Sequence, residues 1–210
     1  MHRTLLVTLL AGLSLIAGCA ARHSWVLAPG QHPQSFERRV TVKTHGPPKF
    51  LASRPDFPFI VASPQARNHF EAFGPATLNA MLDELLEQLP VDPDRVYLTG
   101  LSMGGMWTYG WAIQHPERFA AIAPVCGLWD PADACRLKDV PVWAFHGAQD
   151  PVVPLDGDQV MIDAIKACGG DARLTVYLYT GHDSWNQAYA DPELYQWLLQ
   201  QRRNAPSGGK

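Results

Sequence analysis

The chain has 210 residues, of which 47% are hydrophobic, 18% charged and 10% aromatic. This composition can fill a hydrophobic core, and it excludes both an intrinsically disordered chain and a small scaffold stapled by disulfides. The 17 Lys and Arg residues against 20 Asp and Glu residues give a net charge of −3. With no long run of one sign, this charge argues against a nucleic-acid partner.

The first 18 residues have the pattern of a secretory signal. Arg3 supplies a positive charge, and an apolar run follows from residue 5 to residue 16. A run of roughly a dozen apolar residues is shorter than the ~20 that span a bilayer, but it fits the apolar region of a signal peptide. We therefore predict that residues 1–18 are cleaved and lie outside the fold.

The end of this segment, Ile16-Ala17-Gly18-Cys19, resembles the bacterial lipobox. The resemblance implies that Cys19 becomes the lipidated N-terminus of an exported protein, anchored in the cell envelope at the outer membrane or the periplasmic face. Ala20 follows Cys19, where an Asp would suggest retention at the inner membrane. The alternative is an ordinary cleavage site with an incidental cysteine.

Three cysteines remain after residue 19: Cys126, Cys135 and Cys168. An oxidising compartment permits one disulfide, and proximity in the sequence favours Cys126 with Cys135. Three buried thiols that pack as small hydrophobic side chains are the alternative. The spacing lacks the C-x₂₋₄-C pattern of zinc sites, so the sequence predicts no metal.

Residues 19–48 are rich in Pro, Gly, His and Gln and predict a tether, residues 49–203 predict the folded domain, and residues 204–210 predict a disordered tail. In the domain, short apolar runs alternate with amphipathic segments, as in βαβ units. Five strands are readable, at 57–63, 95–99, 120–125, 142–145 and 174–179. Helices are predicted at 77–89, after Met103, at 158–167 and at 192–201. Because the strands are almost continuously apolar, the fold class is α/β, with a mostly parallel sheet covered by helices on both faces.

The segment Gly100-Leu-Ser102-Met-Gly104 lies between an apolar strand and a helix. A G-x-S-x-G sequence in this context is a nucleophile elbow, a tight turn that lifts the serine hydroxyl above the sheet. The alternative, a glycine-rich phosphate loop, would need a Lys where this chain has Met106. Ser102 is therefore the predicted nucleophile, and the N–H of Met103 is a predicted oxyanion-hole donor.

The acid and the base should follow the nucleophile in that order, each after a later strand. Asp150 follows the strand at 142–145, and His182 follows the strand at 174–179. We predict that His182 accepts the proton of Ser102 and that Asp150 orients and stabilises the imidazolium.

His146 is the competing histidine, but it precedes the acid in the sequence. We therefore interpret it as structural support for the loop that carries Asp150. Asp156 and Asp158 are interpreted as residues at the start of the next helix.

Four sequence blocks resemble α/β-hydrolases of the bacterial carboxylesterase, dienelactone hydrolase-like and predicted-peptidase group. They are 100–105, 119–127, 143–150 and 181–185, and the likeness extends from about Gly46 to Arg203. The resemblance implies hydrolysis of small carboxylic esters without a cofactor.

One part of that pattern is missing. A second oxyanion donor should come from a glycine-rich loop after an earlier strand, and the sequence contains no such block. His45-Gly46-Pro47-Pro48 is similar, but its prolines have no N–H to donate. We therefore expect a fold shortened at its N-terminal strands, and loss of one donor costs about 10²–10³ in rate.

The sequence therefore predicts a lipid-anchored serine hydrolase that acts on small-molecule esters through an acyl-enzyme on Ser102. Trp185 and Tyr189, close to His182, are candidates for an apolar substrate pocket. The alternatives are a weak or inactive envelope lipoprotein that uses the scaffold for binding, and a serine peptidase. A homodimer that completes the exposed sheet edge is a further hypothesis.

Overall fold

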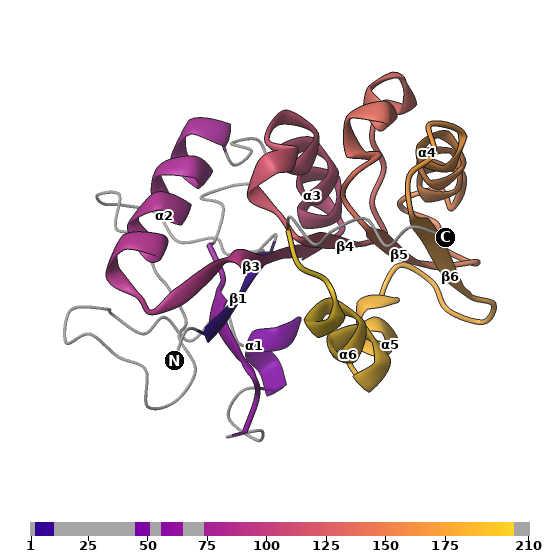
Figure 1. The fold of residues 1–210 in the computed structure, drawn as a ribbon. Coiled ribbons are helices and arrows are strands. Elements are labelled where there is room, and N and C mark those ends of the chain that lie inside the picture. The colour runs from indigo at the N-terminus through magenta and orange to yellow at the C-terminus, as the bar shows by residue number, and fades with distance from the viewer. Residues whose placement is uncertain (1–2, 11–44, 51–55, 65–73, 204–210) are drawn as a thin grey trace, which may run out of the picture.

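A computed structural model describes residues 3–10, 45–50, 56–64 and 74–203. Within these ranges the chain forms one six-stranded sheet with the order β2-β1-β3-β4-β5-β6 (Figure 1). Every neighbouring pair of strands is parallel. The strands are β1 (Arg3–Leu10), β2 (Phe59–Ala62), β3 (Val91–Leu101), β4 (Ala121–Val125), β5 (Val142–Gly147) and β6 (Ala172–Tyr177).

Helices cover both faces of the sheet, as a buried parallel sheet requires. Helices α2 (Pro75–Gln88), α3 (Met103–Gln114) and α4 (Asp156–Ala167) lie on one face, and α1 (Pro47–Phe50), α5 (Trp185–Ala188) and α6 (Pro192–Gln200) lie on the other (Figure 1). Two 3₁₀ helices lie in the connections on either side of β4. The first, η3 (Pro116–Arg118), lies between α3 and β4, and the second, η4 (Pro131–Leu137), lies between β4 and β5. The predicted α/β architecture is confirmed.

The five predicted strands correspond to β2 through β6, with shifted ends. The last of them shows why: it was expected to reach residue 179, but β6 ends at Tyr177. Leu178 and Tyr179 are 64% and 90% exposed and belong to a turn. Their apolar character extended the predicted strand beyond the residues that pair with β5.

The sixth strand, β1, consists of residues that the sequence analysis placed in a signal outside the fold. It lies between β2 and β3, with Leu5 opposite Val96 and Leu9 opposite Gly100. An inner strand of a parallel sheet needs the same short apolar run as the hydrophobic region of a signal, so the pattern does not distinguish them. Residues 19–44 of the predicted tether, including Cys19, and the tail at 204–210 lie outside the described residues. The tether was predicted to extend to residue 48, but Pro47 and Pro48 belong to α1.

No helix in the described ranges combines the length and the apolar character needed to cross a membrane.

The disulfide differs from the predicted pair. Cys135, in η4, is bonded to Cys168 at the C-terminal end of α4, with the two Cα atoms 5.3 Å apart. Cys126 follows β4 and is a buried free thiol. The prediction of Cys126 with Cys135 was wrong because the chain leaves the sheet after β4, so closeness in sequence does not bring these two sulfurs together.

Candidate active site

Ser102 lies at the carboxyl end of β3, between the last residue of that strand and the first residue of α3. Its φ angle is 54°, in the left-handed region that a non-glycine residue rarely adopts. The Ser102 N–H donates a hydrogen bond of 3.0 Å to the carbonyl oxygen of Val125 in the neighbouring strand. This strained strand-to-helix turn is the geometry of a nucleophile elbow.

The two glycines of the motif are required by close packing. A Cβ atom added at Gly100 would collide with the carbonyl oxygen of Gly104, and one added at Gly104 would collide with the carbonyl oxygen of Leu9 in β1. The elbow is therefore packed tightly against its own helix and against β1.

The structure brings Ser102, His182 and Asp150 together in one hydrogen-bonded chain. Ser102 Oγ lies 2.9 Å from His182 Nε2, and His182 Nδ1 lies 2.8 Å from Asp150 Oδ2. The three residues come from the loops after β3, β6 and β5, which meet at the carboxyl edge of the sheet. This is the arrangement of a nucleophile, a base and an orienting acid.

Asp150 is held in place by its own loop. Its Oδ1 accepts hydrogen bonds from the N–H groups of Val152 at 2.8 Å and Val153 at 3.0 Å. Burial alone would raise the pKa of this carboxyl group, but the hydrogen bonds from His182 and from these two N–H groups hold its pKa below the usual range. Asp150 is therefore ionised at neutral pH, as an orienting acid must be.

His182 is reachable from solvent, because its side chain is 21% exposed while that of Asp150 is fully buried. A substrate can therefore approach the imidazole and the serine hydroxyl without displacing the acid.

Met103 is the first residue of α3. The first N–H groups of a helix have no acceptor within the helix and carry the positive end of its dipole. The Met103 N–H is thus available to a negatively charged oxygen above Ser102.

A second oxyanion donor is not identified among the described residues. β1 ends at Leu10, which pairs with Leu101, so the chain leaves this strand beside Ser102. The residues from 11 to 44 lie outside the described ranges.

Cys126 contacts the backbone of Ser102, a feature that the sequence analysis missed. Its Sγ accepts a hydrogen bond of 3.3 Å from the Ser102 N–H, and its φ angle is 43°. Burial raises the pKa of the thiol to about 12, so it is neutral at physiological pH.

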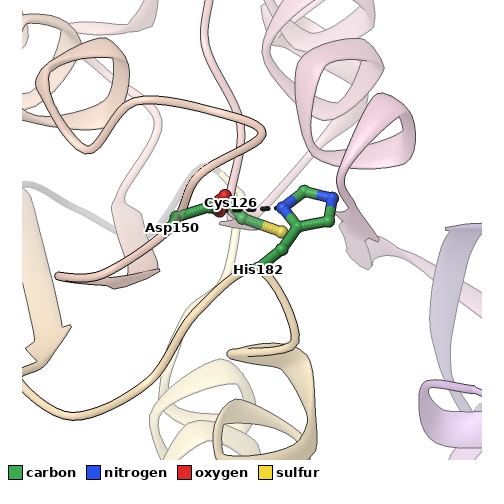
Figure 2. A group of neighbouring side chains, drawn as sticks. All are labelled: Cys126, Asp150 and His182. Atoms are coloured by element: carbon green, nitrogen blue, oxygen red, sulfur yellow. Dashed lines mark hydrogen bonds and ion pairs between the residues drawn. The ribbon is translucent and has the colours of Figure 1, made fainter.

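Cys126, Asp150 and His182 also form a potential metal-binding group. Their ligand atoms lie within 4.8 Å of one another, and Figure 2 shows the Cys126 sulfur beside the Asp150–His182 pair. Sulfur, nitrogen and oxygen ligands of this kind suit zinc. A metal ion there would have to displace the thiol proton and the Asp150–His182 hydrogen bond, so it would compete with the triad.

Trp185 and Tyr189, the two candidates for a substrate pocket, are placed differently. The Trp185 ring packs edge-on at 5.3 Å from the His182 ring and lies 5.7 Å from the His45 ring. Tyr189 has no exposed surface, and its hydroxyl lies 2.9 Å from Thr99 Oγ1. Trp185 thus borders His182, whereas Tyr189 belongs to the core.

His146 and Asp158 form a second buried pair behind Asp150. His146 Nδ1 lies 2.6 Å from Asp158 Oδ2, and His146 Nε2 lies 2.9 Å from the carbonyl oxygen of Val153. The contact with Val153 places His146 against the Asp150 loop, as expected. Asp156 and Asp158 lie in the first turn of α4, as expected, but the Asp158 side chain is buried and turned into the core.

Comparisons with known proteins identify the family of this chain. Residues 64–193, more than half of the chain, match the family described as Phospholipase/Carboxylesterase. The chain is 41% identical over 80 residues to NocK of Nocardia uniformis subsp. tsuyamanensis, a protein named as an esterase, covering 37% of this chain and 23% of NocK. It is 26% identical over 141 residues to carboxylesterase SOBER1 of Arabidopsis thaliana, covering 63% of this chain and 60% of SOBER1.

Among solved structures, a thermostable esterase superimposes with a TM-score of 0.71 at 26% identity, covering 96% of this chain and 56% of that one. The chain spans less than two thirds of each of these three relatives. The resemblance to α/β-hydrolases of the esterase group is confirmed, and the chain belongs to the phospholipase/carboxylesterase family.

Proposed function

We propose that this chain is a serine hydrolase that cleaves carboxylic esters through an acyl-enzyme on Ser102. The hydrogen-bonded chain from Ser102 through His182 to Asp150 is the observation that carries the proposal. The esterase names of the relatives support the same reaction class.

The geometry supports the following sequence of steps. His182 Nε2 accepts the proton as Ser102 Oγ attacks the ester carbonyl carbon, and the N–H of Met103 stabilises the negative charge that develops on the carbonyl oxygen. The intermediate then collapses, and His182 gives its proton to the departing alcohol. A water molecule, activated by the same imidazole, releases the acid and regenerates Ser102.

Asp150 keeps the correct ring nitrogen of His182 available. Because His182 Nδ1 donates to the Asp150 carboxylate, Nε2 is left to accept the serine proton. The ionised carboxylate also stabilises the imidazolium that forms during both half-reactions.

Trp185 supports a preference for esters with an apolar group on one side. Its indole is half-buried and packs against the catalytic imidazole, so it offers an apolar surface next to the reacting bond. We infer that this surface contacts the acyl or the alcohol portion of a small ester.

The test is covalent labelling with a fluorophosphonate probe, together with hydrolysis of a short-chain aryl ester. Ser102→Ala should abolish both, since it removes the nucleophile. Ser63→Ala is the matched control, because Ser63 is buried just beyond β2 and belongs to no part of the triad. It should retain labelling and turnover.

Labelling that survives in Ser102→Ala, or its absence in a folded parent protein, would overturn the proposal. In the second case a scaffold that binds without catalysis becomes the better description.

A further inference from the structure

His45 is an exposed side chain beside the candidate active site, and the mechanism above does not use it. Its segment, residues 45–48, is similar in sequence to an oxyanion-hole block, but prolines stand where N–H donors are needed. In the structure the His45 ring packs edge-on against the Trp185 ring, with the two ring centroids 5.7 Å apart. Trp185 in turn packs edge-on against His182 at 5.3 Å. The three rings therefore form a row that leads away from the triad.

The backbone next to His45 is buried and restricted. Gly46 has a φ angle of 69°, in the left-handed region that favours glycine, and its carbonyl oxygen accepts a hydrogen bond of 3.0 Å from the Lys49 N–H. Gly46, Pro47 and Pro48 are buried, whereas His45 is exposed, and each proline fixes its own φ angle. Helix α1, which begins at Pro47, lies on the same face of the sheet as α5 (Figure 1). The turn thus holds an exposed ring in place beside the site, and such preorganisation favours recognition of a ligand.

In this row of rings, His45 has the polar atoms that remain available to a ligand. His182 Nε2 is paired with Ser102 Oγ, and His182 Nδ1 is paired with Asp150. The Trp185 N–H is buried and has no hydrogen-bond partner in the described part of the chain, so the indole offers a ligand only its ring. Within the described ranges the His45 ring nitrogens take part in no hydrogen bond. An imidazole carries at least one N–H, so His45 can donate to an oxygen atom of a bound molecule.

We propose that Trp185 and His45 form a subsite for esters that carry a hydrogen-bond acceptor at the far end of an apolar group. This inference rests on the proposed serine hydrolase function and names a substrate class for the same site. The apolar group lies on the Trp185 ring, next to the reacting bond, and the His45 imidazole donates to an ether or hydroxyl oxygen beyond it. His45 is a specificity-determining residue, since it contacts the substrate away from the reacting atoms.

The order of the rings leads to this substrate class. The acceptor must lie beyond an apolar spacer, because Trp185 separates His45 from His182. A group that is apolar throughout would take water away from the His45 N–H without replacing the hydrogen bond, which is unfavourable. An ester with an oxygen at the end of the spacer restores that bond, so the subsite distinguishes it from an ester of equal length without the oxygen.

The test compares kcat/KM for pairs of esters in which one methylene group is replaced by an ether oxygen. On the acyl side the pair is 4-nitrophenyl 4-methoxybutyrate and 4-nitrophenyl hexanoate, which share the leaving group and the chain length. On the alcohol side the pair is 2-methoxyethyl butyrate and butyl butyrate. The quantity measured is the ratio of kcat/KM for the ether ester to that for its methylene counterpart. The pair whose ratio depends on His45 identifies the portion of the ester that lies on Trp185.

His45→Phe is the decisive variant, because it keeps a ring against Trp185 and removes the N–H. It should lower the ratio for one pair by about threefold to tenfold, the effect of one hydrogen bond. His45→Gln restores a donor and should recover part of the preference. A purely structural role of His45 would instead lower kcat/KM for both members of a pair equally and leave the ratio unchanged.

Lys49→Gln is the matched control. Lys49 is exposed on α1, close to His45 in the sequence, and its replacement should leave both ratios at the parental value. Parental ratios for both pairs in folded His45→Phe would overturn the inference. A ratio that falls equally in Lys49→Gln would also overturn it, since the preference would then not be specific to His45.

A second measurement needs neither turnover nor a change at position 45. In ¹⁵N-labelled Ser102→Ala, which retains His45 and Trp185, the ring signals of His45 should shift when the preferred ether ester is added and shift less with its methylene counterpart. Equal responses to the two esters would overturn the inference even if no His45 variant folds. Loss of Ser102-dependent hydrolysis in the parent protein would refute the proposed function, whereas intact hydrolysis with ratios that do not depend on His45 would refute this inference alone.

Discussion

Removal of residues 1–18 is the perturbation with the largest consequence for this fold. It produces the chain that a lipoprotein signal would leave after cleavage, with Cys19 first, and it deletes β1 from the interior of the sheet. Strand β2 would then lose its partner in the described structure, because it pairs with β1 and not with β3.

The size of the effect follows from the buried side chains of β1. Leu5, Leu6, Val7 and Leu9 each have 0% exposed surface. Full burial of such a side chain contributes about 1.5–3 kcal/mol, so these four contribute roughly 6–12 kcal/mol to the free energy of unfolding, as an upper estimate. A whole domain is stable by only about 5–15 kcal/mol. We therefore expect that the chain beginning at Cys19 does not form this sheet.

The assay is urea unfolding of both chains, followed by tryptophan fluorescence, together with aryl ester hydrolysis. Leu6→Asp in the full-length chain is a point version of the same perturbation, and Leu6→Val is its control, since Val keeps an apolar side chain on that face. Truncation and Leu6→Asp should abolish the cooperative transition. An unchanged midpoint and full activity in the truncated chain would refute the assignment of β1 to the working fold.

The assignment of residues 3–10 to β1 also bears on the localisation of the protein. In one molecule, residues 3–10 cannot be both a cleaved signal and an inner strand, so lipidation of Cys19 and retention of β1 exclude each other. Intact mass measurement of the protein recovered from its host distinguishes the two forms. An acylated Cys19 at the N-terminus would support the envelope lipoprotein, and residues 1–18 still attached would support β1.

Further outcomes concern the triad and its surroundings. Asp150→Asn should lower kcat by about 10⁴. Because the pKa of Asp150 is held below its usual range, its charged form stabilises the fold above the unfolded pKa of about 3.9, and this contribution is lost as the pH falls further; the melting temperature of Asp150→Asn should depend less on pH in that range than that of the parent. Added Zn²⁺ should inhibit hydrolysis reversibly, and Cys126→Ala should raise the concentration required; equal inhibition of both proteins would exclude Cys126 as a ligand. Trp185→Ala should raise KM for aryl esters more than it lowers kcat, and a loss confined to kcat would contradict a substrate contact. Reduction of the bond between Cys135 and Cys168, which are 33 residues apart, should lower the free energy of unfolding by about 3–4 kcal/mol, measured by urea titration with and without reductant.

The triad could be predicted because each member follows a strand with a strong sequence pattern. The turn at Ser102 tolerates little but glycine on either side, and the loops after β5 and β6 place Asp150 and His182 at the same edge of the sheet. Topology alone therefore brings these three residues together.

The contacts behind the triad could not be predicted in the same way. Asp158 occupies a position where acidic residues commonly stabilise the start of a helix, and the sequence does not reveal that its side chain turns into the core to meet His146. The prediction for Tyr189 was wrong for a related reason: an aromatic residue close to His182 in the sequence can face either a pocket or the core. Tyr189 is buried, and its hydroxyl forms a hydrogen bond with that of Thr99, 90 positions away in the sequence.

Strand β1 links the fold of the sheet to the geometry around Ser102. Leu9 in β1 approaches so closely that only glycine fits at position 104, which is one of the two glycines that shape the elbow around Ser102. The neighbouring strand therefore constrains the position of Ser102, as the glycines themselves do. If β1 is absent, the elbow loses the surface against which it packs. We then expect the distance of 2.9 Å between Ser102 Oγ and His182 Nε2 to change. The geometry of the proposed triad thus depends on which segment occupies the strand position beside β3.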